Sequence, residues 1–348
     1  MTIVDYKAAG VDIAAGNEAV KRIKPLVEKT FTPPVKTQVG AFGSCFDLKS
    51  LLNEYDHPLL VQSIDGVGTK IKVAKMMNQF DTIGIDLVSA TANDILVMGA
   101  KPLTLLDYIA SDKLKPEIIE QILVGMSKAC CEQQIALVGG ETAEMPDTYL
   151  DGEHDLVGIV TGVVEQDKMI TGQSIKSGDL VFGVQSSGLH TNGYSLARKL
   201  FFDVAGLDVD SYHPELQKTV GEALLEPHIN YAHPILHSLK EGVDIKGMAH
   251  ITGGGFIDNI PRILPANCAV EIKAASWEPL PIFSVMQQLG RLDNFEMYRT
   301  FNMGIGLVVV VDPASADALT EAFKLFPSFQ LSCIGFVYEQ NESSVRIV

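Results

Sequence analysis

Apolar positions in the first half of the chain follow helical and strand periods in turn. Apolar side chains recur at helical spacing over 12–30 and 81–98, and glycine and proline at 99–102 end the second pattern. A third helix is predicted at 116–133, with proline in its first turn. Segment 31–44 holds prolines and glycines and is predicted to be a loop. Short apolar runs bounded by turn residues predict four strands, at 58–64, 103–109, 135–138 and 156–164.

The second half begins where the composition turns polar, after residue 164, and we place a domain junction near residue 170. The patterns beyond it predict two strands and two helices, at 180–185, 305–311, 192–202 and 256–263. Helices and strands alternate in both halves, which is typical of a mixed α+β or α/β protein. The expected domains are residues 1–170 and 171–348.

Charge and cysteine usage narrow the class of protein. The 348 residues include 27 basic and 43 acidic side chains, for a net charge of −16. This balance argues against a nucleic-acid footprint and against binding to an anionic membrane surface. No signal peptide and no membrane span is visible, and five cysteines without a CxxC pair suggest reduced thiols, so we expect a cytoplasmic protein. Such an acidic chain needs metal ions or backbone N–H groups to bind anionic metabolites.

The first candidate site follows the strand at 58–64. There Asp65 precedes two glycines, Gly66 and Gly68, and then Thr69 and Lys70. Glycines let the backbone approach an anion, the carboxylate could hold Mg²⁺, and the hydroxyl and ammonium could contact phosphate. The spacing fits neither a Walker loop nor a GxGxxG loop. The alternative is a glycine turn with solvated Asp and Lys side chains.

Three polar residues interrupt the apolar helix predicted at 81–98. At about 100° per residue, Asn93 lies roughly 20° and Asp94 roughly 80° from Asp86, so all three share one side of the helix. Acidic side chains bordered by apolar ones are costly to bury unless they are paired or bind a metal. The alternative is an amphipathic helix with a solvated face.

Residues 139–144 form a third polar segment at the end of a buried strand. Two glycines lead into Glu141 and Glu144, with a threonine between them. A solvated acidic turn after a strand would explain this segment if it stood alone. Three carboxylate sites in one half of the chain favour a metal–nucleotide site instead.

Two polar segments in the second half precede predicted helices. His190 and Thr191 lie just before the first and Asn192 begins it, where helix N–H groups can bind an anion and an imidazole can donate to phosphate. The glycine triplet 253–255 precedes the second and could form another anion cradle. The alternatives are a structural histidine and a flexible turn. Segment 297–306 is expected to support the site.

Six segments, taken together and in order, resemble the phosphoribosylformylglycinamidine cyclo-ligases, also called aminoimidazole ribonucleotide synthetases, of purine biosynthesis. They are DGVGTK, GIDLVSATANDILVMGA, GGETAEMP, SSGLHTNGYSLAR, ITGGGFIDNIPR and EMYRTFNMGIG. The resemblance runs from Tyr6 to near the C-terminus. DGVGTK is shared with a wider superfamily, and the HTNGYSLAR and GGGFIDNIPR segments are more specific. One departure is segment 40–45, where a second glycine beside Gly40 is expected.

The resemblance implies a homodimer of two-domain subunits. N-terminal mixed-sheet domains would pair, and α/β C-terminal domains would complete the active-site cleft. The implied reaction converts ATP and formylglycinamidine ribonucleotide to aminoimidazole ribonucleotide, ADP and phosphate through an iminophosphate, with Mg²⁺ as the metal.

The resemblance and the motifs together suggest a role for each candidate residue. Catalysis is assigned to His190, Lys70 and Asp94. ATP contacts are assigned to Gly43, Asp65, Gly66, Gly68, Thr69, Asn93 and Glu141. Mg²⁺ is assigned to Asp65, Asp94 and Glu141. Substrate contacts, including a cradle for the ribose 5-phosphate, are assigned to Thr191, Asn192, Gly253, Gly254 and Gly255.

Other protein families remain possible at this point. Selenophosphate synthase would need a reactive cysteine beside a lysine in the N-terminal loop, but Phe46 follows Cys45. Thiamine-monophosphate kinase would be expected to carry a different acidic cluster in place of DGVGTK. Formylglycinamidine synthetase is usually longer and partners a glutaminase. A non-catalytic nucleotide-binding subunit would not require several carboxylate sites.

Overall fold

The computed structural model describes residues 12–341 and 344–348, so the start of the resemblance, at 6–11, lies outside the described residues. The chain forms two compact units. The N-terminal unit consists of Met1–Ile95 and Pro102–Gln166, and the C-terminal unit of Leu96–Lys101 and Asp167–Val348. Within the described part of the chain, no helix combines the length and the apolar character needed to cross a membrane.

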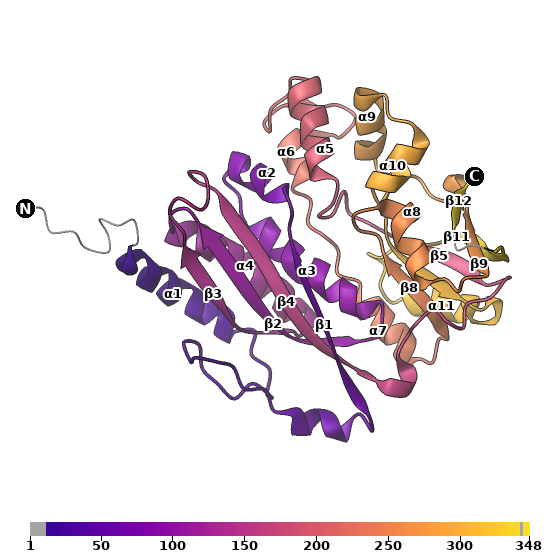
Figure 1. Ribbon diagram of the computed structural model, residues 1–348, viewed down its shortest axis with the longest axis horizontal. Helices are drawn as coiled ribbons and strands as arrows, with labels where there is room; N and C mark the ends of the chain where they lie inside the picture. The colour runs from indigo at the N-terminus through magenta and orange to yellow at the C-terminus, as the bar shows by residue number, and fades with distance from the viewer. Residues whose placement is uncertain (1–11, 342–343) are drawn as a thin grey trace, which may run out of the picture. The chain divides into compact units, whose positions relative to one another are not determined.

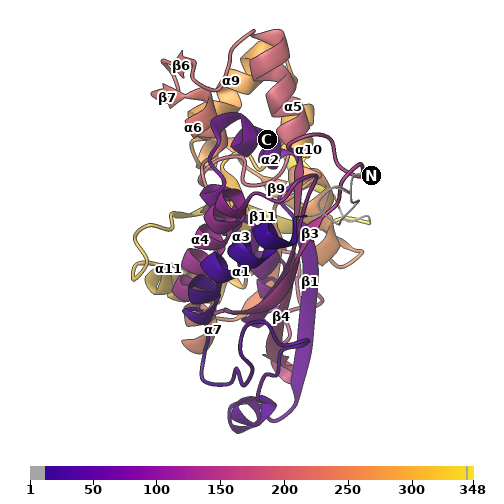
Figure 2. The ribbon, with the colours of Figure 1, turned by 90° about the vertical axis from the view of Figure 1, so that its left-hand side faces the viewer.

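The N-terminal unit is built on a four-stranded mixed sheet in the order β1-β4-β2-β3. Its strands are β1 (Pro58–Gly66), β2 (Lys101–Ser111), β3 (Ala136–Glu144) and β4 (His154–Glu165). β1 pairs antiparallel with β4, whereas β2 pairs parallel with β3. Three helices lie on one face of this sheet (Figures 1 and 2): α1 (Ile13–Glu28), α3 (Asp81–Leu96) and α4 (Pro116–Gln133). A short helix, α2 (Lys70–Met77), directly follows β1.

Large apolar side chains are exposed on the strands of this sheet. Ile64 on β1 is 65% exposed and lies opposite Ile159 on β4, which is 36% exposed. Directly paired residues project from the same face of a sheet, so the two isoleucines lie side by side. Leu60, four residues before Ile64 and therefore on the same face, is 59% exposed. Together with exposed Leu106 on β2, these residues give the sheet an apolar surface that the helices do not cover.

The C-terminal unit holds a six-stranded sheet in the order β12-β9-β11-β5-β10-β8. The strands are β5 (Leu180–Gln185), β8 (Ile245–His250), β9 (Cys268–Ile272), β10 (Ile305–Val311), β11 (Leu331–Glu339) and β12 (Val345–Ile347), and a separate hairpin comprises β6 (Tyr212–His213) and β7 (Lys218–Thr219). The helices are α5 (Tyr194–Arg198), α6 (Val220–Leu224), α7 (Ala232–Lys240), α8 (Gly255–Asn259), α9 (Pro281–Gly290), α10 (Asn294–Thr300) and α11 (Ala316–Phe323).

The core of this unit lies between β5, β8 and β10 and the helices α7 and α11. Every residue of β10 is buried, which explains why its sequence is a continuous apolar run without alternation. The loops at the ends of β5 and β8 therefore start from a rigid base. These loops carry the polar segments at 186–193 and 250–255.

Candidate active site

The end of β1 brings two of the expected carboxylates to one side of the N-terminal sheet. Asp65 is exposed, and its Oδ1 accepts a 2.8 Å hydrogen bond from the Gly66 N–H. Two residues earlier, the Ser63 hydroxyl donates to Asp94 Oδ2 at 3.0 Å. Side chains two apart on a strand share a face, so Asp94 of α3 lies on the same side of β1 as Asp65. These two carboxylates can contribute to one cation site.

Lys70 is the clearest difference from the sequence-based expectation. We expected its ammonium on the phosphates of ATP, but the side chain is 0% exposed. Its Nζ lies 2.9 Å from Asp86 Oδ1 and 2.8 Å from Oδ2, and the Asp86 side chain is also 0% exposed. Lys70 begins α2 and Asp86 belongs to α3, so the ion pair ties the loop at 64–70 to the helix behind it.

Glu141 lies at the edge of the sheet opposite to Asp65. β1 and β3 are the two outer strands, with β4 and β2 between them. Neighbouring strands are about 4.8 Å apart, so the backbones of β1 and β3 are separated by roughly 14 Å. Oxygen ligands of one Mg²⁺ ion lie within a few ångströms of each other. Within one chain, Glu141 and Asp65 are therefore too far apart to hold the same ion.

The remaining N-terminal candidates differ in their exposure to solvent. Thr69 is the residue just before α2 and is partly exposed, and Gly68 is exposed in the same loop. Gly43 is exposed in the loop before β1. In contrast, Asn93 of α3 is fully buried.

In the C-terminal unit, His190 is buried in a tight turn before α5. Its backbone has φ = 61°, a left-handed conformation that is uncommon for residues other than glycine and often marks a functional turn. Its exposed fraction is 0%, and its Nε2 accepts a 3.3 Å hydrogen bond from the Ser187 N–H. Asn302 holds the same turn, because its amide donates to Gly188 O at 2.9 Å and its Oδ1 accepts from Ser186 at 3.1 Å. Segment 297–306 thus supports this loop.

The loop at 191–192 and the glycine triplet lie next to each other. A Cβ added at Gly253 would lie 3.4 Å from the Asn192 side-chain oxygen. Gly254 and Gly255 have backbone reasons to be glycine, since their φ values are +93° and +55° and a Cβ at Gly255 would lie 2.1 Å from Tyr298 O. Gly253, which is exposed, is therefore the member of the triplet best placed to contact a ligand.

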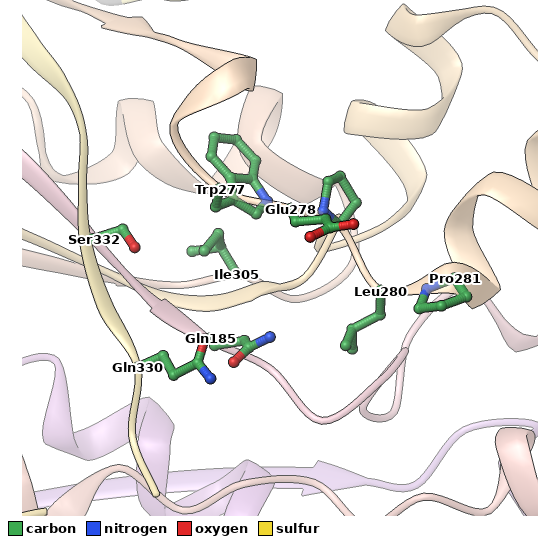
Figure 3. Close-up of a pocket in the computed structure, with 9 residues that line it drawn as sticks. Gln185, Trp277, Glu278, Leu280, Pro281, Ile305, Gln330 and Ser332 are labelled. Atoms are coloured by element: carbon green, nitrogen blue, oxygen red, sulfur yellow. The ribbon is translucent and has the colours of Figure 1, made fainter. Parts of the chain in front are cut away.

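A cavity of about 330 Å³ in the C-terminal unit is lined by none of the candidates named above. Figure 3 shows Gln185 and Gln330 on one side of it and Trp277 on the other, with Ile305 between them. The lining contains one carboxylate, Glu278, and no predicted site residue. The cavity has few of the groups that phosphoryl transfer needs, so we do not place the chemistry there.

His228 was missed by the sequence reasoning. It stands in an isolated position in the segment EPHINY, with no neighbouring glycine or carboxylate pattern to single it out. In the structure its ring stacks on His190, with ring centroids 3.9 Å apart, and its Nε2 lies 3.1 Å from Nε2 of His250. Only the folded loops bring these three histidines together.

Comparisons with known proteins give the family. Residues 51–164 match the family model for AIR synthase related protein, N-terminal domain, and residues 176–348 match the model for the C-terminal domain. A phosphoribosylformylglycinamidine cyclo-ligase of Trichlorobacter lovleyi is 50% identical over 312 residues, which cover 90% of this chain and 88% of that protein.

Solved structures share the fold. E. coli HypE, a hydrogenase maturation protein, is 20% identical with a TM-score of 0.67, and the match covers 93% of this chain and 92% of that one. A HypE structure in complex with ATP is 18% identical with a TM-score of 0.63, covering 93% and 89%. At these identities the likeness shows the fold alone, which confirms the predicted mixed α/β class. With half of its residues identical to a cyclo-ligase along nine-tenths of its length, this chain belongs to the phosphoribosylformylglycinamidine cyclo-ligase family.

Proposed function

We propose that this chain catalyses the ATP-dependent cyclisation of formylglycinamidine ribonucleotide to aminoimidazole ribonucleotide, with release of ADP and phosphate. The observation that carries this proposal is the 50% identity over 312 residues to a phosphoribosylformylglycinamidine cyclo-ligase. This match spans both units, so it includes the segments assigned to the nucleotide and those assigned to the substrate. A cytoplasmic location is part of the same proposal.

The chemistry explains why ATP is consumed. A formamide carbonyl is a poor electrophile and its oxygen is a poor leaving group. Transfer of the γ-phosphoryl to that oxygen forms an iminophosphate, and the amidine nitrogen of the same molecule then displaces phosphate. Because the nucleophile and the electrophile belong to one molecule, ring closure gains from proximity. The protein has to position the two substrates and neutralise phosphate charge.

Mg²⁺ is the metal that the N-terminal carboxylates fit best. Asp65 and Asp94 offer hard oxygen ligands from one side of β1, and Asp65 is open to solvent. We assign the first ion to this pair and Glu141 to a separate ion, because the two sheet edges are too far apart to share one. Bound Mg²⁺ would neutralise triphosphate charge, while Gly66, Gly68 and Thr69 would position the phosphates next to it.

Burial changes the proposed roles of two residues. Lys70 and His190 are both fully buried, so we assign them to positioning the loops in front of them. Asn192 and Gly253 are the more accessible substrate candidates, with Thr191 behind them.

The proposed assembly is a homodimer that forms through the N-terminal sheet. The exposed apolar residues Leu60, Ile64 and Ile159 support this proposal, because a solvated patch of this kind is costly unless a partner covers it. The partner that matches this patch best is a second copy of the same sheet.

The test is product formation by the purified chain. Incubation with ATP, Mg²⁺ and formylglycinamidine ribonucleotide should yield ADP and the ring-closed ribonucleotide in equal amounts by mass spectrometry. Asp65→Asn should lower kcat/KM on the order of 100-fold and raise the Mg²⁺ concentration required, because a charge-neutralising ligand is lost. Asp167→Asn, an exposed carboxylate change elsewhere, is the matched control. ATP turnover with a different acceptor, or full activity and unchanged Mg²⁺ dependence of Asp65→Asn, would overturn the assignment.

A further inference from the structure

Three histidines from separate segments converge inside the C-terminal unit. They are His190 in the turn before α5, His228 in the loop before α7 and His250 at the end of β8. Their exposed fractions are 0%, 2% and 6%. One ring nitrogen from each lies within 4.8 Å of the others. Three of the eight histidines of the chain are thus buried at a single point.

The spacing of the nitrogens is close to that of a metal site. A tetrahedral zinc ion bound at 2.0–2.1 Å holds its ligand nitrogens about 3.3–3.4 Å apart. His228 Nε2 and His250 Nε2 are 3.1 Å apart, and one nitrogen of each of the three rings lies within 4.8 Å of the others. At 3.1 Å one of these nitrogens donates an N–H to the other, and a bound metal ion would take the place of that proton.

Neighbouring groups hold the rings in place. The Thr191 hydroxyl lies 3.4 Å from His228 Nδ1, which leaves Nε2 as the nitrogen that faces His250. Gly306 makes room for His190, since a Cβ there would lie 2.5 Å from the His190 Cε1 and 2.1 Å from the Tyr231 hydroxyl. Polar partners of this kind orient metal-binding imidazoles and select the nitrogen that binds.

We propose that His190, His228 and His250 bind one divalent transition-metal ion of the zinc class. Ligand sets of imidazoles alone favour Zn²⁺, Co²⁺ or Ni²⁺ over Mg²⁺, which prefers oxygen. Three protein ligands leave one coordination position for water or another small ligand. This site is distinct from the Mg²⁺ site proposed at Asp65, and it does not depend on the proposed reaction.

The experiment uses the full chain, stripped with a chelator and titrated with Co²⁺ as the spectroscopic probe. We expect one ion per chain by elemental analysis after dialysis, with the strong visible absorption of four-coordinate Co²⁺, which Zn²⁺ abolishes and excess Mg²⁺ does not. His228→Gln and His250→Gln should weaken binding by more than the roughly 10–100-fold caused by changes in outer partners. His57→Gln, at an exposed position in the N-terminal unit, should bind like the unmodified chain.

Absence of a stoichiometric ion would overturn the proposal. Equal binding by His228→Gln would overturn it as well, because the ion would then lie elsewhere, and competition by Mg²⁺ would overturn it because that result indicates oxygen ligands. X-ray absorption of the zinc-loaded unmodified chain gives a second measurement that needs no folded variant. It should show three imidazole nitrogens at about 2.0 Å, and a shell of oxygens alone would contradict the site. These measurements need no substrate, so failed cyclisation and failed metal binding are distinguishable.

Discussion

The Lys70–Asp86 ion pair allows a quantitative test of what the loop at 64–70 does. Lys70→Met removes the ammonium and leaves a carboxylate whose side chain is 0% exposed. Removing one partner of a buried pair costs about 3–5 kcal/mol, because the other charge stays buried without compensation. For a unit of this size, each kcal/mol lowers the melting temperature by about 2–4 °C, so we expect a drop of roughly 6–20 °C.

The double variant Lys70→Met/Asp86→Leu removes both charges together. Replacing a whole buried pair with apolar side chains is often neutral or stabilising, so most of the lost stability should return. Lys324→Met is the matched control, because it breaks an exposed pair with Glu321 that contributes only about 0–1 kcal/mol.

Urea unfolding followed by circular dichroism measures all four proteins. A single variant within about 1 kcal/mol of the unmodified chain would refute the buried-pair reasoning, as would a double variant no more stable than Lys70→Met. The double variant also tests whether Lys70 positions the loop or contacts ATP directly. If Lys70 only positions the loop, the KM for ATP of the double variant stays close to that of the unmodified chain. A large rise in this KM would instead indicate that Lys70 contacts the phosphates of ATP.

Three further predictions concern the N-terminal sheet. Gly140→Ala should destabilise the unit by about 1–3 kcal/mol in urea unfolding, because its Cβ would lie 2.2 Å from Asp107 Oδ1. Gly139→Ala is the control and should destabilise it less, because a Cβ at Gly139 meets only the Leu106 side chain at 3.5 Å. Burial raises the pKa of Asp107 from 3.8 to about 7, so the folded chain holds this proton more tightly than the unfolded chain. The resulting stability should be lost as the pH rises from about 4 to about 7, and Asp107→Asn should flatten that dependence in unfolding measurements across this range. Ile64→Lys should shift the chain from dimer to monomer in analytical ultracentrifugation, and an unmodified chain that sediments as a monomer would contradict the proposed assembly.

Local patterns predicted the regular elements well. The helix expected at 81–98 is α3, Asp81–Leu96, and the strand expected at 305–311 is β10 with the same bounds. Both are long or strongly apolar, so the pattern is sufficient. The helix α2 was missed, because Lys70 was read as a ligand in a loop, although it begins this helix.

The arrangement of the candidate site needed the tertiary structure. The burial of Lys70 depends on Asp86, sixteen residues away on another helix, and no local spacing predicts that contact. The separation of Asp65 from Glu141 follows from the strand order β1-β4-β2-β3, which the sequence does not reveal. His228 joins His190 and His250 only through long-range folding. Local motifs therefore predicted which residues are candidates for the site, but they did not predict which residues those candidates contact.

The ion pairs explain how a chain with a net charge of −16 could bind a triphosphate. The lysines closest in sequence to Asp65 already have carboxylate partners: Lys70 contacts Asp86, and Lys72 and Lys75 contact Glu153. Asp86 balances the charge of Lys70, whereas Lys72 and Lys75 share the single carboxylate of Glu153, so the three lysines keep one net positive charge among them. In the proposed mechanism, backbone N–H groups and Mg²⁺ at Asp65 and Asp94 would supply the rest of the attraction for the phosphates. We therefore predict that the proposed metal ion contributes to nucleotide binding itself as well as to phosphoryl transfer, since Asp65 and Asp94 without it would repel an anion.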